Sequence, residues 1–260
     1  MSVDTIDEHE DASVALAVES VSVRFGSLQA LSDVTIEIPR RGVVGIIGPN
    51  GAGKSTLMGV IGGQLTPTHG RVTLFGRDVT NVRSTTRAVA GLRRTFQSLE
   101  LFDEMTVREN LRAGLTKRLP TVFSSRWYRS TREADERVTS LMEELGLSRY
   151  EYMEPSSLSA PVRRWISYGR AIIGDPRCIL LDEPAAGLAD AERQALASRV
   201  RSDVDSREIA AVVVEHDMGF IRNLCDFIYV LNSGEIIAKG TFDEIAADRA
   251  VRDAYLGPTE

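Results

Sequence analysis

One eight-residue segment, GPNGAGKS at residues 48–55, constrains the fold more than any other part of the chain. It follows a continuous apolar run at 42–47, which predicts a strand buried on both faces, and it leads into a predicted helix at 55–65. The pattern G-x-x-x-x-G-K-[ST] between a strand and a helix predicts a phosphate-binding loop, because glycines let backbone N–H groups close around phosphate oxygens. The start of the helix adds its dipole to the same anion site. The residues expected to bind a nucleotide here are Gly48, Pro49, Asn50, Gly51, Ala52, Gly53, Lys54, Ser55 and Thr56, with the Ser55 hydroxyl as a Mg²⁺ ligand.

Two carboxylates at the end of a second apolar run predict the rest of the site. Asp182 and Glu183 follow the run at 178–181, and we expect Asp182 to hold Mg²⁺ through water and Glu183 to polarise the attacking water. Alone, such a run is as often a strand that enters a solvated turn. His216 follows a predicted strand at 211–215, at the strand end where ligands bind in α/β folds, so it could donate to a γ-phosphate or orient the water.

The order of apolar patterns predicts the fold class and its divisions. Half-buried strands at 15–23 and 31–38 precede the loop, and a strand is expected at 71–74. Strand patterns then give way to helical periodicity from 83 to about 167, with 118–130 read as irregular surface, before strands return. We therefore expect an α/β, RecA-like P-loop NTPase core with an N-terminal antiparallel β portion and an inserted α-helical subdomain. The expected divisions are an acidic tail at 1–13 and a single domain at 14–257, with core segments 14–97 and 166–257 around a helical subdomain at 98–165.

Charge and hydropathy exclude several classes of function. The 260 residues carry 37 acids against 31 bases, a formal net charge of −6. A nucleic-acid binder usually carries the opposite balance, so no nucleic-acid partner is expected. The longest aliphatic stretch, at 209–214, is about 6 residues against roughly 20 for a membrane-spanning helix. Cys178 and Cys225 stand among apolar neighbours and are expected to be buried, reduced thiols.

These motifs together resemble the nucleotide-binding subunit of an ATP-binding cassette (ABC) transporter, over about 15–257. The resemblance implies ATP and Mg²⁺ as cofactors, Glu183 as the catalytic glutamate and His216 as the switch histidine. It implies that Phe25 stacks on adenine, and that Gln97 contributes to the Mg²⁺ site and faces the membrane subunit. Taken alone, Phe25 is equally well a core aromatic and Gln97 a surface residue.

Four further segments resemble one subtype within this family. RTFQSLELFDEMTVRENL, DEPAAGL, VEHDM and AYLG resemble the ATPases of branched-chain or hydrophobic amino-acid uptake systems, while urea and lipopolysaccharide-export cassettes share parts of this set. The resemblance implies transmembrane permease subunits as partners, often with a second ABC ATPase subunit, as a heterodimer or a homodimer. It places the chain at the cytoplasmic face of the cell membrane, held there through the permease rather than by its own insertion.

One segment departs from the family pattern. The signature, usually LSGGQ, reads LSAPV at 158–162. In the family, the serine hydroxyl and a glycine N–H of one cassette cap the γ-phosphate bound to the other cassette. Ser159 keeps the hydroxyl, but Pro161 has no N–H, and its ring restricts both itself and Ala160. Losing one hydrogen bond to a charged group costs roughly 1.5–3 kcal/mol, so we expect turnover about 10- to 100-fold slower at the site that this signature completes.

Other interpretations of the same residues stay open. Ser159 can simply cap a helix whose first turn contains Pro161. The altered signature also fits an ATP-binding regulatory or assembly module with little hydrolysis, although the intact Glu183 favours an ATPase. A P-loop kinase of small molecules would explain the phosphate loop but not the Asp-Glu pair and His216 together.

Overall fold

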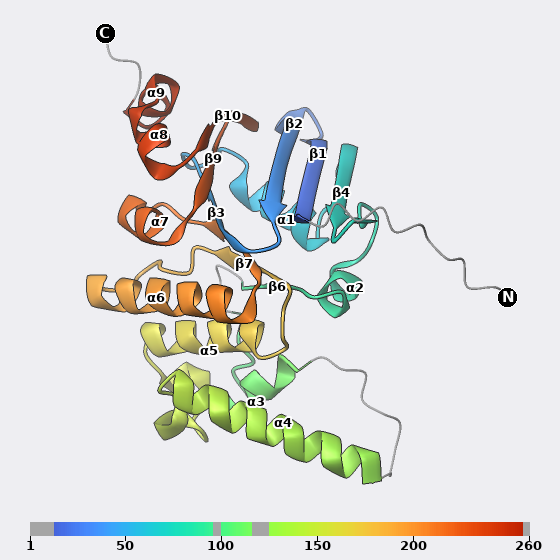
Figure 1. Cartoon of the computed structure of the whole chain (residues 1–260), viewed down its shortest axis with the longest axis vertical. Coiled ribbons are helices and arrows are strands. Elements are labelled where there is room, and N and C mark those ends of the chain that lie inside the picture. The colour runs from blue at the N-terminus through green and yellow to red at the C-terminus, as the bar shows by residue number, and fades with distance from the viewer. Residues whose placement is uncertain (1–12, 96–99, 116–124, 257–260) are drawn as a thin grey trace, which may run out of the picture.

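The structure, a computed structural model, describes residues 13–95, 100–115 and 125–256, so most of the predicted acidic tail lies outside the described residues. Its strands form a 4-stranded sheet with the order β2-β1-β4-β5 and a 6-stranded sheet with the order β10-β9-β3-β8-β7-β6. Most of the helices gather on the far side of the larger sheet from the smaller one (Figure 1). The predicted α/β fold with an N-terminal antiparallel portion is confirmed.

The smaller sheet is built from the first part of the chain. Its strands are β1 (Val14–Phe25), β2 (Leu28–Pro39), β4 (His69–Leu74) and β5 (Arg77–Asp78), and every pair in it is antiparallel. The predicted strands at 15–23 and 31–38 are confirmed, and both are longer than the alternating pattern indicated. Their alternation buries one face of the hairpin against the larger sheet.

The larger sheet brings the ends of three distant strands together. It contains β3 (Gly42–Ile47), β6 (Leu92–Arg94), β7 (Cys178–Asp182), β8 (Ala210–Val214), β9 (Phe227–Asn232) and β10 (Glu235–Gly240). All neighbouring pairs are parallel except β9 and β10, which are antiparallel. Because β8 pairs with both β3 and β7, the carboxyl ends of these three strands lie at one edge of the sheet.

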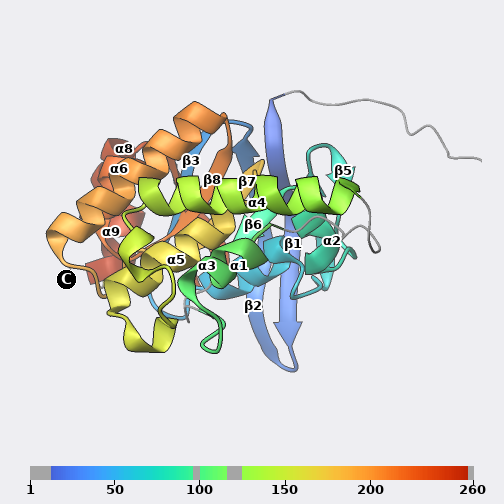
Figure 2. The same cartoon turned by 90° about the horizontal axis from the view of Figure 1, so that it is seen from below.

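Helices cover the sheet and form a separate group at one end of the molecule. The helix α1 (Lys54–Gly62) follows β3. The helices α3 (Val107–Ala113), α4 (Ser125–Glu144) and α5 (Ala160–Ile172) lie away from the hairpin of β1 and β2 (Figure 1) and beside one another (Figure 2). The other helices of the described residues are α2 (Ser84–Val89), η1 (Ser148–Tyr150), η2 (Pro155–Ser157), α6 (Asp190–Arg207), α7 (Met218–Leu224), α8 (Phe242–Ala247) and α9 (Arg249–Leu256). None of them is both long and apolar enough to span a membrane.

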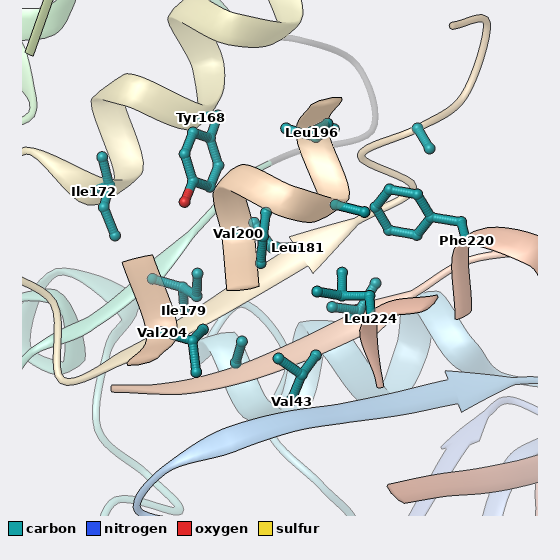
Figure 3. Packing of buried hydrophobic residues seen from close by; sticks show 14 of the residues in the cluster. Val43, Tyr168, Ile172, Ile179, Leu181, Leu196, Val200, Val204, Phe220 and Leu224 are labelled. Carbon is teal, nitrogen blue, oxygen red and sulfur yellow. The ribbon is translucent and has the colours of Figure 1, made fainter. Parts of the chain in front are cut away.

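Two hydrophobic clusters hold the layers together, one on each face of the larger sheet. On one face, alternate residues of β3, β7 and β8 pack against α1 and the smaller sheet. On the other face, the intervening residues pack against α5, α6 and α7, as Figure 3 shows. The labelled side chains of that second cluster are Val43, Tyr168, Ile172, Ile179, Leu181, Leu196, Val200, Val204, Phe220 and Leu224. Burial on both faces explains the continuous apolar runs of these strands.

Three predicted elements differ from the structure. The strand β6 falls in the region where strand patterns were expected to end, because two of its three residues, Arg93 and Arg94, are charged and hide the pattern. Helix α4 begins at Ser125, so the second half of the predicted irregular segment at 118–130 is helical. Helix α1 ends at Gly62 rather than at Leu65, because Gly63 adopts a left-handed conformation with φ of 76°.

Candidate active site

The phosphate loop connects β3 to α1 and needs glycine where it passes neighbouring backbone. A Cβ on Gly53 would lie 2.7 Å from the carbonyl oxygen of Ala30, so no larger residue fits there without movement. Lys54, the first residue of α1, folds back over the loop. Its Nζ donates to the carbonyl oxygens of Gly48 at 2.7 Å and Pro49 at 2.9 Å. The ammonium group is therefore held over the loop, where a phosphate would lie.

The start of α1 is free of competing side chains. Gly53 at the N-cap supplies no side-chain hydrogen bond, and the first turn contains no acidic residue. A Cβ on Gly51 would meet no atom within 4 Å. Burial lowers the pKa of Lys54, while the negative charges of Glu183 and Asp182 act in the opposite direction. Uncapped N–H groups, open space beside the loop and a buried cation fit a bound polyphosphate.

Asp182 ends β7 as a buried carboxylate, and its partner is an arginine that sequence reasoning missed. Arg94 Nη2 donates to Asp182 Oδ2 at 2.8 Å from the neighbouring strand β6. The same guanidinium reaches the carbonyl oxygen of Met58 in α1 at 3.1 Å and Gln64 Oε1 at 2.8 Å. Arg94 thus joins β6, β7 and the segment around α1. Arg94 is a charged residue in a strand of only three residues, so no apolar pattern in the sequence indicates its role.

Glu183 and His216 meet at the edge of the sheet. Glu183 follows β7 directly, and its Oε1 lies 2.8 Å from His216 Nε2, within hydrogen-bond distance. The imidazole is 40% exposed and the glutamate side chain 17% exposed. The pair therefore lies, partly exposed, at the edge of the sheet where β7 and β8 end. The negative charges of Asp182 and Glu183 both act on the pKa of Lys54. The phosphate loop and these two carboxylates therefore belong to one site.

Two further charged residues support the turn after Glu183. The buried Glu215 accepts hydrogen bonds from the backbone N–H of Ala185 at 2.7 Å and of His216 at 3.0 Å. Burial raises the pKa of the Glu215 carboxyl. Arg164 Nη1 donates to the carbonyl oxygen of Glu183 at 2.9 Å. Sequence reasoning gave Arg164 no role in the site, since a side chain that binds backbone leaves no motif.

The remaining predicted site residues have different outcomes. Phe25 ends β1 and is 49% exposed, which excludes the alternative of a core aromatic. Ser159 is the N-cap residue of α5 and is exposed, but its side chain makes no capping hydrogen bond. Ser159 therefore holds the N-cap position that the helix-capping alternative predicted, but it does not make the expected capping hydrogen bond. Gln97 lies outside the described residues.

The oxygen donors present at this edge fit a magnesium ion. Ser55 is exposed at the second position of α1, and Asp182 carries the buried carboxylate at the end of β7. Hydroxyl and carboxylate oxygens are the ligands that Mg²⁺ takes in phosphate sites, where it keeps several waters and binds the substrate phosphates as well. The charge it supplies would offset that of the β- and γ-phosphates.

A P-loop nucleotide site on a RecA-like α/β core therefore defines the class of this protein. Residues 31–186 match the family model described as ABC transporter, and residues 235–257 match the model described as branched-chain amino acid ATP-binding cassette transporter. The chain is 36% identical to the high-affinity branched-chain amino acid transport ATP-binding protein LivG of Salmonella typhimurium, over 93% of this chain and 97% of that protein. It is 35% identical to the corresponding protein BraF of Pseudomonas aeruginosa, with the same coverage of both chains.

The fold is also found among solved structures. The ADP conformation of an ATP-binding cassette of an ABC transporter superposes with a TM-score of 0.80 at 30% identity, covering 94% of this chain and 99% of that one. The chain belongs to the ATP-binding subunits of ABC transporters. It is an ATPase that couples the hydrolysis of ATP to transport.

Proposed function

We propose that this chain drives the import of branched-chain or other hydrophobic amino acids, from the cytoplasmic face of a cell membrane. The observation that carries the proposal is the match of residues 235–257 to the branched-chain model, which lies outside the nucleotide site and so reports on the type of transporter. The names of the relatives at 36% and 35% identity support the same substrate class. The chain would attach to the membrane through transmembrane permease subunits.

The geometry supports a distinct role for each group of site residues. The loop at 48–56 would bind the phosphates, with Lys54 on the β- and γ-phosphates. Ser55, Asp182 and Gln97 would hold Mg²⁺, and Phe25, which is exposed at the end of β1, would stack on adenine.

Glu183 is the group that would act on water. The oxygen of that water would form a bond to the γ-phosphorus while the bond between this phosphorus and the leaving ADP oxygen breaks, and Glu183 would accept the proton released. His216, whose Nε2 lies 2.8 Å from Glu183 Oε1, would orient this water or donate to the γ-phosphate.

The altered signature would make the ATPase pair asymmetric. Pro161 lies in the first turn of α5, in a helix that begins at Ala160, so the segment presents neither the glycine N–H nor the flexibility of LSGGQ. Ser159 is exposed with no capping bond, which leaves its hydroxyl available to a second cassette. ATP on this chain would be hydrolysed against the intact signature of a partner ATPase, while ATP on the partner would be cut slowly.

The first experiment measures Mg²⁺-dependent ATP turnover by the full chain, alone and with a homologous second ATPase, with E183Q as the control. The asymmetric pair predicts that the chain alone binds ATP but turns it over about 10- to 100-fold more slowly than the pair. Fast turnover by the chain alone, abolished in E183Q, would overturn the asymmetry. In the pair, the combined substitutions A160G, P161G and V162Q should raise turnover, and an unchanged rate would count against a defective signature.

The substrate class needs its own test. The transporter, reconstituted with its permease and an external binding protein, should show ATP turnover that rises with leucine, isoleucine or valine. Stimulation by urea instead would assign the chain to the urea type. Turnover that responds to no small solute would contradict import.

A further inference from the structure

Glu183 stands in a backbone conformation that residues with a Cβ rarely adopt. Its φ is 46°, in the left-handed region, and it falls between the buried strand β7 and Pro184. Such a conformation persists where the surroundings hold it, and it is common at functional sites. The direction in which the carboxylate leaves the backbone depends on this turn staying in place.

The peptide group between Glu183 and Pro184 has a single polar atom to hold it. Proline has no N–H, so only the carbonyl oxygen of Glu183 can be anchored. That oxygen accepts from the N–H of Ala186 at 3.2 Å within the same turn, and from Arg164 Nη1 at 2.9 Å. The bond from Arg164 reaches this oxygen from another element, helix α5.

Two other anchors of the turn come from β8 and the residue after it. The N–H of Glu183 donates to the carbonyl oxygen of Val214 at 2.9 Å, and the N–H of Ala185 donates to Glu215 at 2.7 Å. Arg164 is half-buried, and burial lowers its pKa, while the charges of Glu215 and Glu183 oppose that shift. A charged donor in this setting makes a stronger bond to a carbonyl than a neutral donor does.

We propose that Arg164 is a positioning residue for Glu183, which it serves by fixing the carbonyl of the Glu183–Pro184 peptide from helix α5. The inference rests on the proposed role of Glu183 in hydrolysis. Arg164 lies in the second turn of α5, whose N-cap is Ser159 of the altered signature. The helix that faces a second cassette in the proposed pair therefore also sets the backbone of the glutamate on its own chain.

The test compares R164M and R164K with R199M, measured on the full chain, with the second ATPase where pairing is needed. R199M is the matched structural control, because Arg199 pairs with Asp203 and Glu144 away from Glu183. R164M should lower kcat about 10- to 100-fold with the KM for ATP unchanged, and lysine should restore much of the loss because it keeps a charged donor. R199M should lower stability while kcat stays near that of the unmodified chain.

Amide hydrogen exchange gives a readout that does not depend on turnover. Without nucleotide, R164M should speed exchange in the segment 184–188 and R164K should not, while R199M should leave that segment unchanged. Equal exchange in R164M and the unmodified chain, or a kcat in R164M no lower than in R199M, would overturn the proposal. If E183Q keeps full turnover, the role of Glu183 fails instead, and the exchange result still decides whether Arg164 fixes the turn.

Discussion

The carboxylate of Glu183 and the imidazole of His216 lie 2.8 Å apart although each belongs to a different strand end. Glu183 follows β7 and His216 comes two residues after β8, and the parallel pairing of these strands places both residues at one edge. The sheet, rather than any local motif, therefore creates the pair. This relationship makes separate predictions for the two side chains.

Substitution E183Q should abolish turnover while ATP still binds, because the amide keeps the size of the side chain but cannot accept the proton from water. Loss of a general base typically lowers the rate about 10²- to 10⁴-fold. H216A should lower kcat less, since Glu183 remains in place without its neighbour. Steady-state kinetics and ATP binding on both variants check this, and weaker ATP binding in E183Q would show that the glutamate acts in binding.

Two of the N-caps that carry hydroxyl side chains, Thr106 and Ser159, offer a matched comparison. Thr106 caps α3 with a capping box, in which its side chain accepts from the N–H of Glu109, whereas Ser159 makes no such bond at α5. T106A should cost about 1 kcal/mol of unfolding free energy, and S159A less than about 0.5 kcal/mol. Urea unfolding measures both. A loss in S159A as large as in T106A would restore the helix-capping role and weaken the case for a hydroxyl directed at a second cassette.

Breaking the buried pair of Arg94 and Asp182 should be costly. R94M leaves the carboxylate of Asp182 buried without this partner, and removing one member of a buried pair costs about 3–5 kcal/mol. R93M, at the neighbouring position of β6, is the control, because Arg93 forms no ion pair with an acid of the described residues, whereas Arg94 does. Its effect on the unfolding midpoint should be small. Similar midpoints for the two variants would show that the ion pair contributes little in solution.

Cys178 is buried as predicted, whereas Cys225 is only half-buried. Both thiols should still react slowly with thiol reagents until the chain unfolds, and Cys178 should be the slower of the two. Burial raises the pKa of Cys178 and of Cys225 to about 12, so both thiols stay protonated in the folded chain at pH 8. Because these pKa values are higher in the folded than in the unfolded chain, stability should fall as the pH rises from about 9 towards 12. Labelling at pH 8 should be slow for the folded chain and should reach both thiols in denaturant. Rapid labelling of the folded chain would contradict the burial.

Sequence reasoning found the parts of the site that sit on strong patterns. The apolar runs before Gly48 and Asp182 marked β3 and β7, because strands buried on both faces have no polar positions to interrupt them. It missed β6, from which Arg94 donates a hydrogen bond to Asp182 on the neighbouring strand β7. It also missed the partners of the turn after Glu183. Arg164 and Glu215 bind backbone atoms of distant segments, and such contacts follow from the folded arrangement rather than from spacing in the sequence.

The order of the larger sheet also sets when the site can exist during synthesis. The last strand that the site needs, β8, inserts between β3 and β7, so the phosphate loop and the two carboxylates have no shared scaffold until Val214 has been made. Pairings between residues far apart in sequence form late and slowly, since the intervening chain must first be ordered. A nascent chain that ends before β8 carries both halves of the site and lacks the strand that joins them. We therefore expect a growing chain that has not yet formed β8 to hydrolyse no ATP.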